Sequence, residues 1–322
     1  MSLGRFFKLN SGYEIPAVGL GTWLSKPSEV EHAVEVALRC GYRHLDCAAV
    51  YQNEPEVGRG WKKSGISREQ LFITSKLWNT HHHPDHVKDA LNRTLKDLQT
   101  DYLDLYLVHW PVSFKNSNET LPLDPVTKRV RLTDVPTADT WAAMEKLVQV
   151  GKVRSVGISN FTMAKTQELL KTATIPPAVN QIEAHPFLQQ PELMAFMKYN
   201  KTLVVAYSPL GNNLSNLPRV VDDPKVQQIA TKLGKDPAAV LISWAVQRGT
   251  VVVPKSVTPS RIKSNFQDFI IPDEEFEELN SLERNQRFNF PNPWGADIFG
   301  ELGDHEAEAR AEAWSAKQRV NT

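Results

Sequence analysis

The 322-residue sequence has no excess of charge of either sign, because Lys and Arg together number 37 and Asp and Glu together also number 37. Proteins that bind nucleic acid normally carry a basic excess, so we expect no nucleic-acid partner. The two cysteines, Cys40 and Cys47, are too few for a disulfide framework and suit a reducing compartment. The sequence also lacks the ~20 apolar residues of a membrane span and the apolar stretch of a signal peptide. We therefore expect a cytoplasmic protein without a membrane partner.

The glycine fingerprint of a Rossmann dinucleotide site is missing as well. In the G-x-G-x-x-G pattern, a third glycine follows three residues after the second, directly behind a strand. Gly19-Leu20-Gly21 has Leu24 at that position, and Gly58-Arg59-Gly60 has Lys63 there and no apolar strand before it. The sequence contains no P-loop either. A Rossmann dehydrogenase is therefore not expected.

Short apolar strands alternate with helical patterns along the chain. The strand candidates are nearly continuous in apolar residues, as in parallel sheets covered on both faces. They are residues 18–21, 42–46, 71–76, 103–109, 153–159, 178–183, 203–207 and 251–254. The helix candidates are residues 29–40, 84–98, 140–150, 162–171, 191–198, 237–247 and 259–266. This order predicts an α/β fold, one parallel (β/α)8 TIM barrel, with residues 1–322 as a single domain.

Three segments fall outside the repeat. Residues 6–17 predict an N-terminal β-hairpin that turns at Asn10-Ser11-Gly12. Residues 111–134 form a long polar insertion after the fourth strand, and the tail from about 285 to 322 is rich in Asn and Pro before it becomes charged. Because long loops and tails of a barrel tend to build its active site, we expect the tail to form a C-terminal substrate loop.

Most strand candidates end, on their carboxyl side, in a polar or titratable residue. An apolar strand has no packing reason to end in this way so often, and in a barrel these ends converge on the face that hosts chemistry. The residues are Asp46, Lys76, His109, Ser159-Asn160, Asn180-Gln181 with Glu183, Tyr207-Ser208 and Lys255-Ser256.

Asp46, Tyr51, Lys76 and His109 together suit proton delivery to a carbonyl that accepts hydride. The developing alkoxide needs a proton donor and an electrostatic stabiliser. A tyrosine with its usual pKa of about 10 donates poorly at neutral pH, and a nearby Lys76 ammonium would lower the pKa of Tyr51. Asp46 would keep a buried Lys76 charged, and a neutral His109 would orient the carbonyl oxygen. Taken singly, each residue is as well explained by a structural role; the joint placement favours catalysis.

Eight stretches in order resemble the aldo-keto reductase family, from about Phe6 to Phe290. Together they are much more specific than any single motif. They are Val18-Gly19-Leu20-Gly21-Thr22-Trp23, Gly41-Tyr42-Arg43-His44-Leu45-Asp46 with Tyr51, Ile73-Thr74-Ser75-Lys76-Leu77-Trp78, Leu107-Val108-His109-Trp110-Pro111, Gly157-Ile158-Ser159-Asn160-Phe161, Gln181-Ile182-Glu183-Ala184-His185-Pro186, Ala206-Tyr207-Ser208-Pro209-Leu210-Gly211 and Val253-Pro254-Lys255-Ser256.

This resemblance implies a reductase of small aldehydes and ketones that also acts in reverse on polyols such as glycerol. The family's catalytic tetrad falls on Asp46, Tyr51, Lys76 and His109, with Tyr51 as the general acid, or as the base in the oxidative direction. The resemblance also implies a nicotinamide nucleotide extended across the mouth of the barrel. Its contacts would be Ser159, Asn160 and Gln181 to the carboxamide, Tyr207 to the ring, Thr22, Trp23 and Asp46 to the ribose, and Ser208 and Leu210 to the pyrophosphate.

A local basic cluster lies at Lys255-Ser256-Val257-Thr258 and Arg261. Two cations and two hydroxyl groups suit a 2′-phosphate, which an arginine can bind through two hydrogen bonds. We therefore expect NADP(H), with NAD(H) as a less preferred cofactor; the structural alternative is a solvated start of the last helix. By the resemblance, Asn265 would also contact the cofactor. Ser264 stands where many relatives carry Glu, which leaves the adenine contact and the cofactor preference open.

Aromatic residues that follow the candidate catalytic positions predict the walls of an apolar substrate pocket. They are Trp23, Trp78, Trp110 and Phe114. The tail resembles that of fungal members such as xylose reductases and NADP-dependent glycerol dehydrogenases. Within it, Arg287 and Asn289 are candidates for binding substrate hydroxyls or a carboxylate. A purely structural role in the loop is equally compatible with their types.

We expect no metal site, because consecutive His81, His82 and His83 do not share one face and lack a surrounding cluster of ligands. The expected partner is a small carbonyl or polyol substrate, and the expected state is a monomer or weak dimer. Two other functions stay open. A cofactor-sensing regulatory subunit of the same fold would bind the cofactor with negligible turnover, and a Schiff-base aldolase would use Lys76 as its nucleophile.

Overall fold

Eight parallel strands close into a barrel. The structure, a computed structural model, describes residues 2–26, 28–212 and 217–320. Around the barrel the strands are hydrogen-bonded in the order β3-β4-β5-β6-β9-β10-β11-β12. The first and last strands of this order close the barrel, because Gly19 N–H donates to Val252 O (2.9 Å) and Gly21 N–H donates to Pro254 O (3.0 Å). The predicted (β/α)8 barrel is therefore confirmed. The strands are β3 (Leu20–Gly21), β4 (His44–Asp46), β5 (Phe72–Leu77), β6 (Leu103–Val108), β9 (Val153–Ser159), β10 (Val179–Glu183), β11 (Leu203–Tyr207) and β12 (Val251–Val252).

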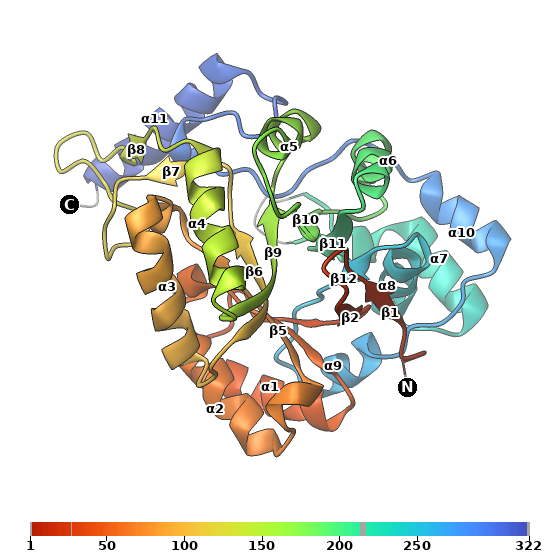
Figure 1. Cartoon of the computed structure of the whole chain (residues 1–322). Coiled ribbons are helices and arrows are strands. Elements are labelled where there is room, and N and C mark those ends of the chain that lie inside the picture. Colours follow the sequence, from red (N-terminus) through yellow and green to blue (C-terminus); the bar gives the residue numbers. More distant parts are fainter. Residues whose placement is uncertain (1, 27, 213–216, 321–322) are drawn as a thin grey trace.

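Helices surround the strands, as Figure 1 shows. Every helix predicted from periodicity is present, and α8 has the predicted bounds; α4 begins earlier than expected, at Thr137. The helices around the barrel are α1 (Glu29–Arg39), α2 (Glu54–Ser64), α3 (Pro84–Asp97), α4 (Thr137–Gln149), α5 (Met163–Leu170), α6 (Pro191–Tyr199), α7 (Pro224–Leu233), α8 (Pro237–Gln247), α9 (Pro259–Asn265) and α10 (Asp273–Asn280).

Helix α2 was not predicted, because its two glycines weaken a helical pattern. Both glycines allow close packing instead. A Cβ at Gly58 would lie 2.5 Å from Asp97 O on α3, and a Cβ at Gly60 would lie 2.6 Å from Glu31 O on α1. Gly58-Arg59-Gly60, which does not match the Rossmann glycine pattern, thus belongs to a tightly packed helix.

The N-terminal hairpin covers one end of the barrel. Strands β1 (Phe6–Lys8) and β2 (Glu14–Pro16) pair antiparallel, as the sequence predicted, and cross in front of the barrel in Figure 1. Leu9 and Ile15 join a buried cluster that includes Leu105 and Val251 from the barrel strands. The side chain of Asn10 donates to Pro177 O, just before β10 begins. The hairpin therefore closes the amino-terminal end and leaves the carboxyl end for a site.

The polar insertion and the C-terminal tail lie side by side although they are far apart in the sequence (Figure 1). The insertion contains a small hairpin of β7 (Ser113–Phe114) and β8 (Leu132–Thr133), and the tail ends in helix α11 (Asp304–Val320). Arg129 in the insertion forms ion pairs with Glu308 (2.7 Å) and Glu312 (3.4 Å) on α11. The tail was predicted as a substrate loop. The structure adds helix α11 at its end, and the ion pairs of α11 with Arg129 hold the tail against the insertion.

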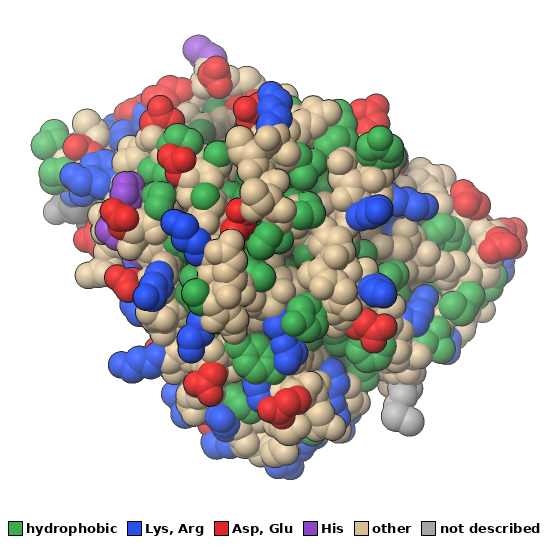
Figure 2. Space-filling view, viewed as in Figure 1, with side chains coloured by type: hydrophobic (Ala, Val, Ile, Leu, Met, Phe, Trp, Pro, Cys, Tyr) green, Lys and Arg blue, Asp and Glu red, His purple; other side chains and the backbone are tan. Residues whose placement is uncertain are grey.

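Charged side chains of both signs are interspersed over the face seen in Figure 2, in keeping with the balanced composition. Within residues 2–26, 28–212 and 217–320, none of the helices combines the length and the apolar character needed to cross a membrane.

A buried carboxyl group lies behind the barrel wall. Glu54 on α2 is 3% exposed and accepts hydrogen bonds from Ser75 Oγ on β5 and from Thr94 Oγ1 on α3 (3.0 Å). Burial raises the pKa of Glu54 to about 7, although the two hydroxyl groups oppose the shift. The folded protein therefore binds this proton more tightly than the unfolded chain does.

We predict that Glu54 makes the folded state less stable as the pH rises. Between about pH 4.5 and pH 7 the unfolded chain loses this proton while the folded protein still holds it, so the stability that the bound proton contributes, about 3 kcal/mol, is lost as the pH rises to the folded pKa. Glu54→Gln imitates the protonated acid, so its free energy of unfolding should fall less between pH 5 and pH 8 than that of the wild type. Urea unfolding across this range, with Glu69→Gln at an exposed site as control, measures the difference; parallel pH profiles would contradict it.

Candidate active site

A cavity of about 1510 Å³ opens at the carboxyl ends of the strands. It exceeds the roughly 300–1,000 Å³ of pockets that hold drug-sized ligands, so it has room for a ligand as long as a dinucleotide together with a small substrate. The predicted catalytic, cofactor-binding and substrate-binding residues line it, except for Lys76 and Phe114, which lie behind its wall. The convergence of the polar strand ends on one face is thus observed.

Asp46 and Lys76 form a buried ion pair at the ends of the neighbouring strands β4 and β5. Lys76 Nζ lies 2.8 Å from Asp46 Oδ2 and donates also to Cys47 O at 2.8 Å. The second carboxylate oxygen, Oδ1, accepts a hydrogen bond from Gln181 Nε2 at 2.8 Å. Lys76 is fully buried. A buried pair persists when its remaining donors and acceptors are satisfied, and these contacts supply that condition.

Tyr51 sits beside this pair in the short helix η1 (Ala49–Tyr51). Lys76 Nζ is 5.3 Å from the centre of its ring, and the His109 ring centre is 6.0 Å away. The expected lowering of its pKa was wrong. Burial raises the pKa of the Tyr51 phenol well above its usual value, and Asp46 adds to the rise. The physical reason is that ionised Tyr51 would be removed from water and would lie near the like charge of Asp46, and both effects disfavour the phenolate. Tyr51 is therefore protonated at neutral pH, the form that a proton donor needs.

His109 follows β6 and is 7% exposed. Burial lowers its pKa well below the usual value, and the Lys76 charge lowers it further. The ring is therefore neutral at neutral pH, as the sequence analysis expected. Its Nδ1 is buried and has no hydrogen-bond partner among the residues that the structure describes. This leaves Nε2 as the ring nitrogen able to meet a ligand in the cavity.

Ser159, Asn160, Gln181 and Tyr207 form one connected polar network next to Asp46. Tyr207 Oη donates to Asn160 Oδ1 (2.7 Å), Asn160 Nδ2 donates to His109 O (3.0 Å), and Ser159 Oγ donates to Gln181 O (2.9 Å). Thr22 Oγ1 donates to Asp46 O at 2.8 Å. The residues predicted to hold the nicotinamide end of a cofactor are therefore brought together with the candidate catalytic group.

Backbone strain gathers around this cavity. Leu24, Asn160 and Ser208 line it, and each has a left-handed backbone, with φ of 53°, 64° and 49°. Residues other than glycine adopt this conformation at a cost of about 1–3 kcal/mol, and such residues cluster at functional sites. The positions of these loops are thus held by tertiary contacts.

The basic cluster lines the far end of the cavity. Lys255, Thr258 and Arg261 are exposed, and buried Asn265 belongs to the same wall. Lys255 Nζ donates to Leu24 O at 3.3 Å across the groove. Neither Lys255 nor Arg261 makes an ion pair with any residue in the described part of the chain. Two uncompensated cations therefore face the same groove.

Aromatic rings form the opposite wall. The rings of Trp78 and Trp110 lie 6.1 Å and 5.0 Å from that of Trp294, and Trp110 also lies 6.1 Å from Phe299. Trp23 lines the cavity too, as predicted. Phe114 was expected in this wall but packs behind it, 5.8 Å from Trp78 and 5.0 Å from Trp294, because β7 turns its side chain into a buried cluster.

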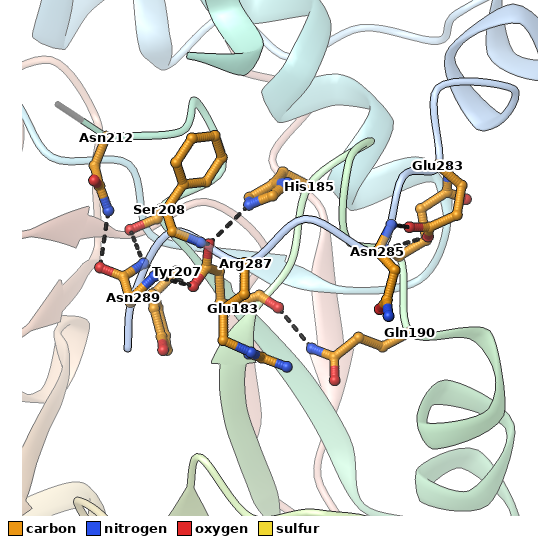
Figure 3. Close-up of polar contacts among 12 residues, drawn as sticks. Glu183, His185, Gln190, Tyr207, Ser208, Asn212, Glu283, Asn285, Arg287 and Asn289 are labelled. Carbon is orange, nitrogen blue, oxygen red and sulfur yellow. Dashed lines mark hydrogen bonds and ion pairs between the residues drawn. The ribbon is translucent and has the colours of Figure 1, made fainter. Parts of the chain in front are cut away.

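The tail residues Arg287 and Asn289 line the cavity but are held by other groups, and Figure 3 shows those that hold Asn289. Arg287 is 5% exposed and paired with Glu301 at 2.6 Å. Asn289 Nδ2 donates to Glu183 Oε2 (2.8 Å) and to Ser208 Oγ (3.3 Å), and Asn289 Oδ1 accepts from Asn212 Nδ2 (2.8 Å). Both amide hydrogens are engaged, so one lone pair of Oδ1 is left for a substrate.

Several contributors were not predicted. Asn53 is 4% exposed and donates to Thr22 O at 2.9 Å, which fixes the loop beside Asp46. Trp294, Phe290 and Phe299 from the tail line or support the pocket. The only signal for them was the aromatic content of the tail, which does not say where a loop folds. Among the described residues, no group of His, Cys, Asp or Glu could hold a metal ion.

Known proteins resemble the chain over most of its length. The family model described as "Aldo/keto reductase family" matches residues 17–284. "Aldo-keto reductase family 1 member A1-A" of Danio rerio is 46% identical over 297 residues, which are 88% of this chain and 91% of the relative. An uncharacterized oxidoreductase of Schizosaccharomyces pombe is 45% identical over 304 residues, 92% of this chain and 94% of the relative. The structure of the aldose reductase from Schistosoma japonicum matches with a TM-score of 0.82 at 46% identity, over 88% of this chain and 93% of that one.

The buried pair makes a prediction about stability. Asp46→Asn removes the carboxylate and leaves the Lys76 charge buried without a counter-charge, which typically costs about 3–5 kcal/mol. Adding Lys76→Met should recover part of this loss, because it removes the unpaired charge. Urea unfolding of the wild type, the single variant and the double variant tests both statements. A loss below about 1 kcal/mol in Asp46→Asn would show that the pair does not carry the assumed charges.

Proposed function

Because the chain belongs to the aldo/keto reductase family and is thus an oxidoreductase, we propose that it reduces small aldehydes and ketones to alcohols with NADP(H). Glyceraldehyde, aldoses and related hydroxy-carbonyl compounds are the proposed substrates, and polyols such as glycerol are the substrates in reverse. The observation that carries this proposal is the buried Asp46–Lys76 pair beside Tyr51 and His109 at the floor of one cavity.

Each of the four residues has a distinct task in this proposal. The protonated phenol of Tyr51 donates its proton to the carbonyl oxygen as charge develops on that oxygen. The neutral ring of His109 donates a hydrogen bond that orients the same oxygen. The Lys76 ammonium, which Asp46 holds in place, stabilises the negative charge left on Tyr51. The tryptophan walls keep water away from the reacting groups.

The donor set of the groove fits a nicotinamide dinucleotide phosphate. A bound nicotinamide would supply the hydride. Ser159, Asn160 and Gln181 would hold its carboxamide and Tyr207 its ring. The ribose would meet Thr22, Trp23 and Asp46, and the pyrophosphate would meet Ser208 and Leu210. At the far end, the two unpaired cations and the hydroxyl groups suit a 2′-phosphate. NAD(H) lacks that phosphate and is proposed as the weaker cofactor.

The structure argues against the two other functions, a Schiff-base aldolase and a regulatory subunit. A Schiff-base aldolase needs a neutral and accessible amine, whereas Lys76 is fully buried and donates to Asp46 and to Cys47 O. A regulatory subunit would bind the cofactor with negligible turnover, and the complete proton-delivery set argues for turnover. The likeness of the tail to fungal polyol-directed members, the cytoplasmic location and the monomeric or weakly dimeric state stay predictions.

Tyr51→Phe should lower the turnover of glyceraldehyde by about 100- to 10,000-fold, the usual contribution of a positioned proton donor. Its affinity for NADPH should stay near that of the wild type, because the ring is kept. Loss of NADPH absorbance measures turnover, and fluorescence titration measures affinity. Tyr199→Phe, at an 85% exposed tyrosine, is the matched control. Near-normal turnover in Tyr51→Phe would remove the general-acid role, and negligible turnover in the wild type would favour the regulatory alternative.

Lys255→Ala and Arg261→Ala should each weaken NADPH binding by about tenfold or more, the worth of a charge-assisted hydrogen bond. NADH binding should change little, because it has no 2′-phosphate. Lys263→Ala removes a neighbouring exposed lysine that does not line the cavity and serves as the control. Calorimetric titration with both nucleotides makes the comparison. Equal losses for NADPH and NADH would place the 2′-phosphate contact elsewhere.

A further inference from the structure

One amide group connects the two halves of the cavity. Asn289 lies between β10, the turn after β11 and the aromatic wall of the tail. Its side chain forms hydrogen bonds with β10 and with the turn after β11 (Figure 3). Glu183 ends β10, whereas Ser208 and Asn212 belong to the turn that follows β11. The contacts with Glu183 and Asn212 are 2.8 Å long and that with Ser208 is 3.3 Å, and together they join three separate regions of the chain.

The tail side of this junction is firmly anchored. The buried Glu183 carboxylate accepts from the backbone N–H groups of Phe288 (2.8 Å) and Asn289 (2.9 Å), from Asn289 Nδ2 (2.8 Å) and from His185 Nε2 (3.0 Å). Burial opposes ionisation, but these donors and the nearby Arg287 lower the pKa of Glu183, so it is charged at neutral pH. The Arg287 cation itself is paired with Glu301.

The cofactor side of the junction is the turn from Ser208 to Asn212. It lines the groove between the Tyr207 ring and the basic cluster, where the proposed cofactor would place its pyrophosphate. Ser208 has a left-handed backbone, so tertiary contacts must hold this turn in place. The bonds from Asn212 and to Ser208 are such contacts, and both end on Asn289.

The substrate side begins at the next residue. The Phe290 ring lies 6.2 Å from Phe299, which lies 6.1 Å from Trp110, and Trp294 packs 5.0 Å from the same tryptophan. Because Phe290 directly follows Asn289, a change in the position of Asn289 would act on the wall that a substrate would meet.

We propose that Asn289 is a positioning residue that couples occupancy of the cofactor groove to the placement of the aromatic substrate wall. The coupling rests on the proposed function, because it assigns the Ser208–Asn212 turn to a nucleotide cofactor. Only an amide satisfies the junction: its nitrogen donates to the Glu183 carboxylate and its oxygen accepts from Asn212. An aspartate at this position would place a second carboxylate against Glu183, and an alanine would remove both links.

The test uses 2′-phospho-ADP-ribose, which has the phosphates of NADP but no nicotinamide ring. This probe fills the groove beside Ser208–Asn212 without reaching the wall, so any effect on the wall has to travel through the protein. Hydrogen–deuterium exchange of peptides from residues 290–300 reports on the wall. In the wild type, bound probe should slow exchange there by about fivefold or more, the lower range of allosteric couplings. This readout does not depend on catalytic activity.

Asn289→Ala and the nearly isosteric Asn289→Asp should both bind the probe yet lose this protection. Asn292→Ala is the matched control, since Asn292 lies in the same tail segment but bonds to Arg310 rather than to the turn. Asn212→Ala should also lose the protection of residues 290–300. The double variant Asn212→Ala/Asn289→Ala should lose no more protection than Asn289→Ala alone, because the two residues share one hydrogen bond.

The outcomes separate the two levels of the proposal. Protection in the wild type and in Asn292→Ala, but not in the Asn289 variants, supports the coupling. Protection that persists in Asn289→Asp, or no protection in the wild type with the probe bound, overturns it. Failure of the probe to bind the wild type contradicts the proposed NADP site instead. Thermal unfolding of each variant shows whether a lost effect reflects an unfolded protein.

Discussion

The buried ion pair between Asp46 and Lys76 is the constraint on which the site depends. Two charges removed from water are tolerated only where their geometry is good and their remaining polar groups are bonded. The barrel meets this condition because β4 and β5 are neighbours and the end of β10 meets theirs at the carboxyl face, so that Gln181 and the carbonyl of Cys47 complete the pair. The same placement puts Tyr51 and His109 on the cavity side, one protonated and one neutral.

The rest of the molecule surrounds the cavity whose floor is formed by the Asp46–Lys76 pair, Tyr51 and His109. The N-terminal hairpin closes the far end of the barrel, so that only the carboxyl end is open. The insertion and the tail, joined by the ion pairs of Arg129 with helix α11, support the aromatic wall, in which Trp294 of the tail packs against Trp78 and Trp110. The turn from Ser208 to Asn212, which would face the proposed cofactor, is joined at Asn289 to the tail segment that carries Trp294.

The sequence predicted the repeating part of this structure well, because buried parallel strands and amphipathic helices leave a periodic signal. It also identified Asp46, Lys76 and His109 from polar residues at strand ends. What it missed depends on contacts between distant segments. Helix α2 was missed because its glycines weaken the helical pattern, although the helix needs them for close packing. Trp294 was missed because no local pattern predicts the path of the tail. The pKa of Tyr51 was predicted in the wrong direction because the extent of its burial depends on the folded structure.

The central claim is that this cavity transfers hydride directly between a nicotinamide and a carbonyl carbon held beside Tyr51. The most direct test is a single-turnover reaction with two preparations of NADPH, each deuterated on one face of the nicotinamide ring, with glyceraldehyde as the acceptor. A fixed site presents one face of the ring, so the account predicts deuterium on the carbinol carbon of the product from one preparation only, with a primary isotope effect on the same one. Deuterium in the product from neither preparation, or equally from both, would contradict it.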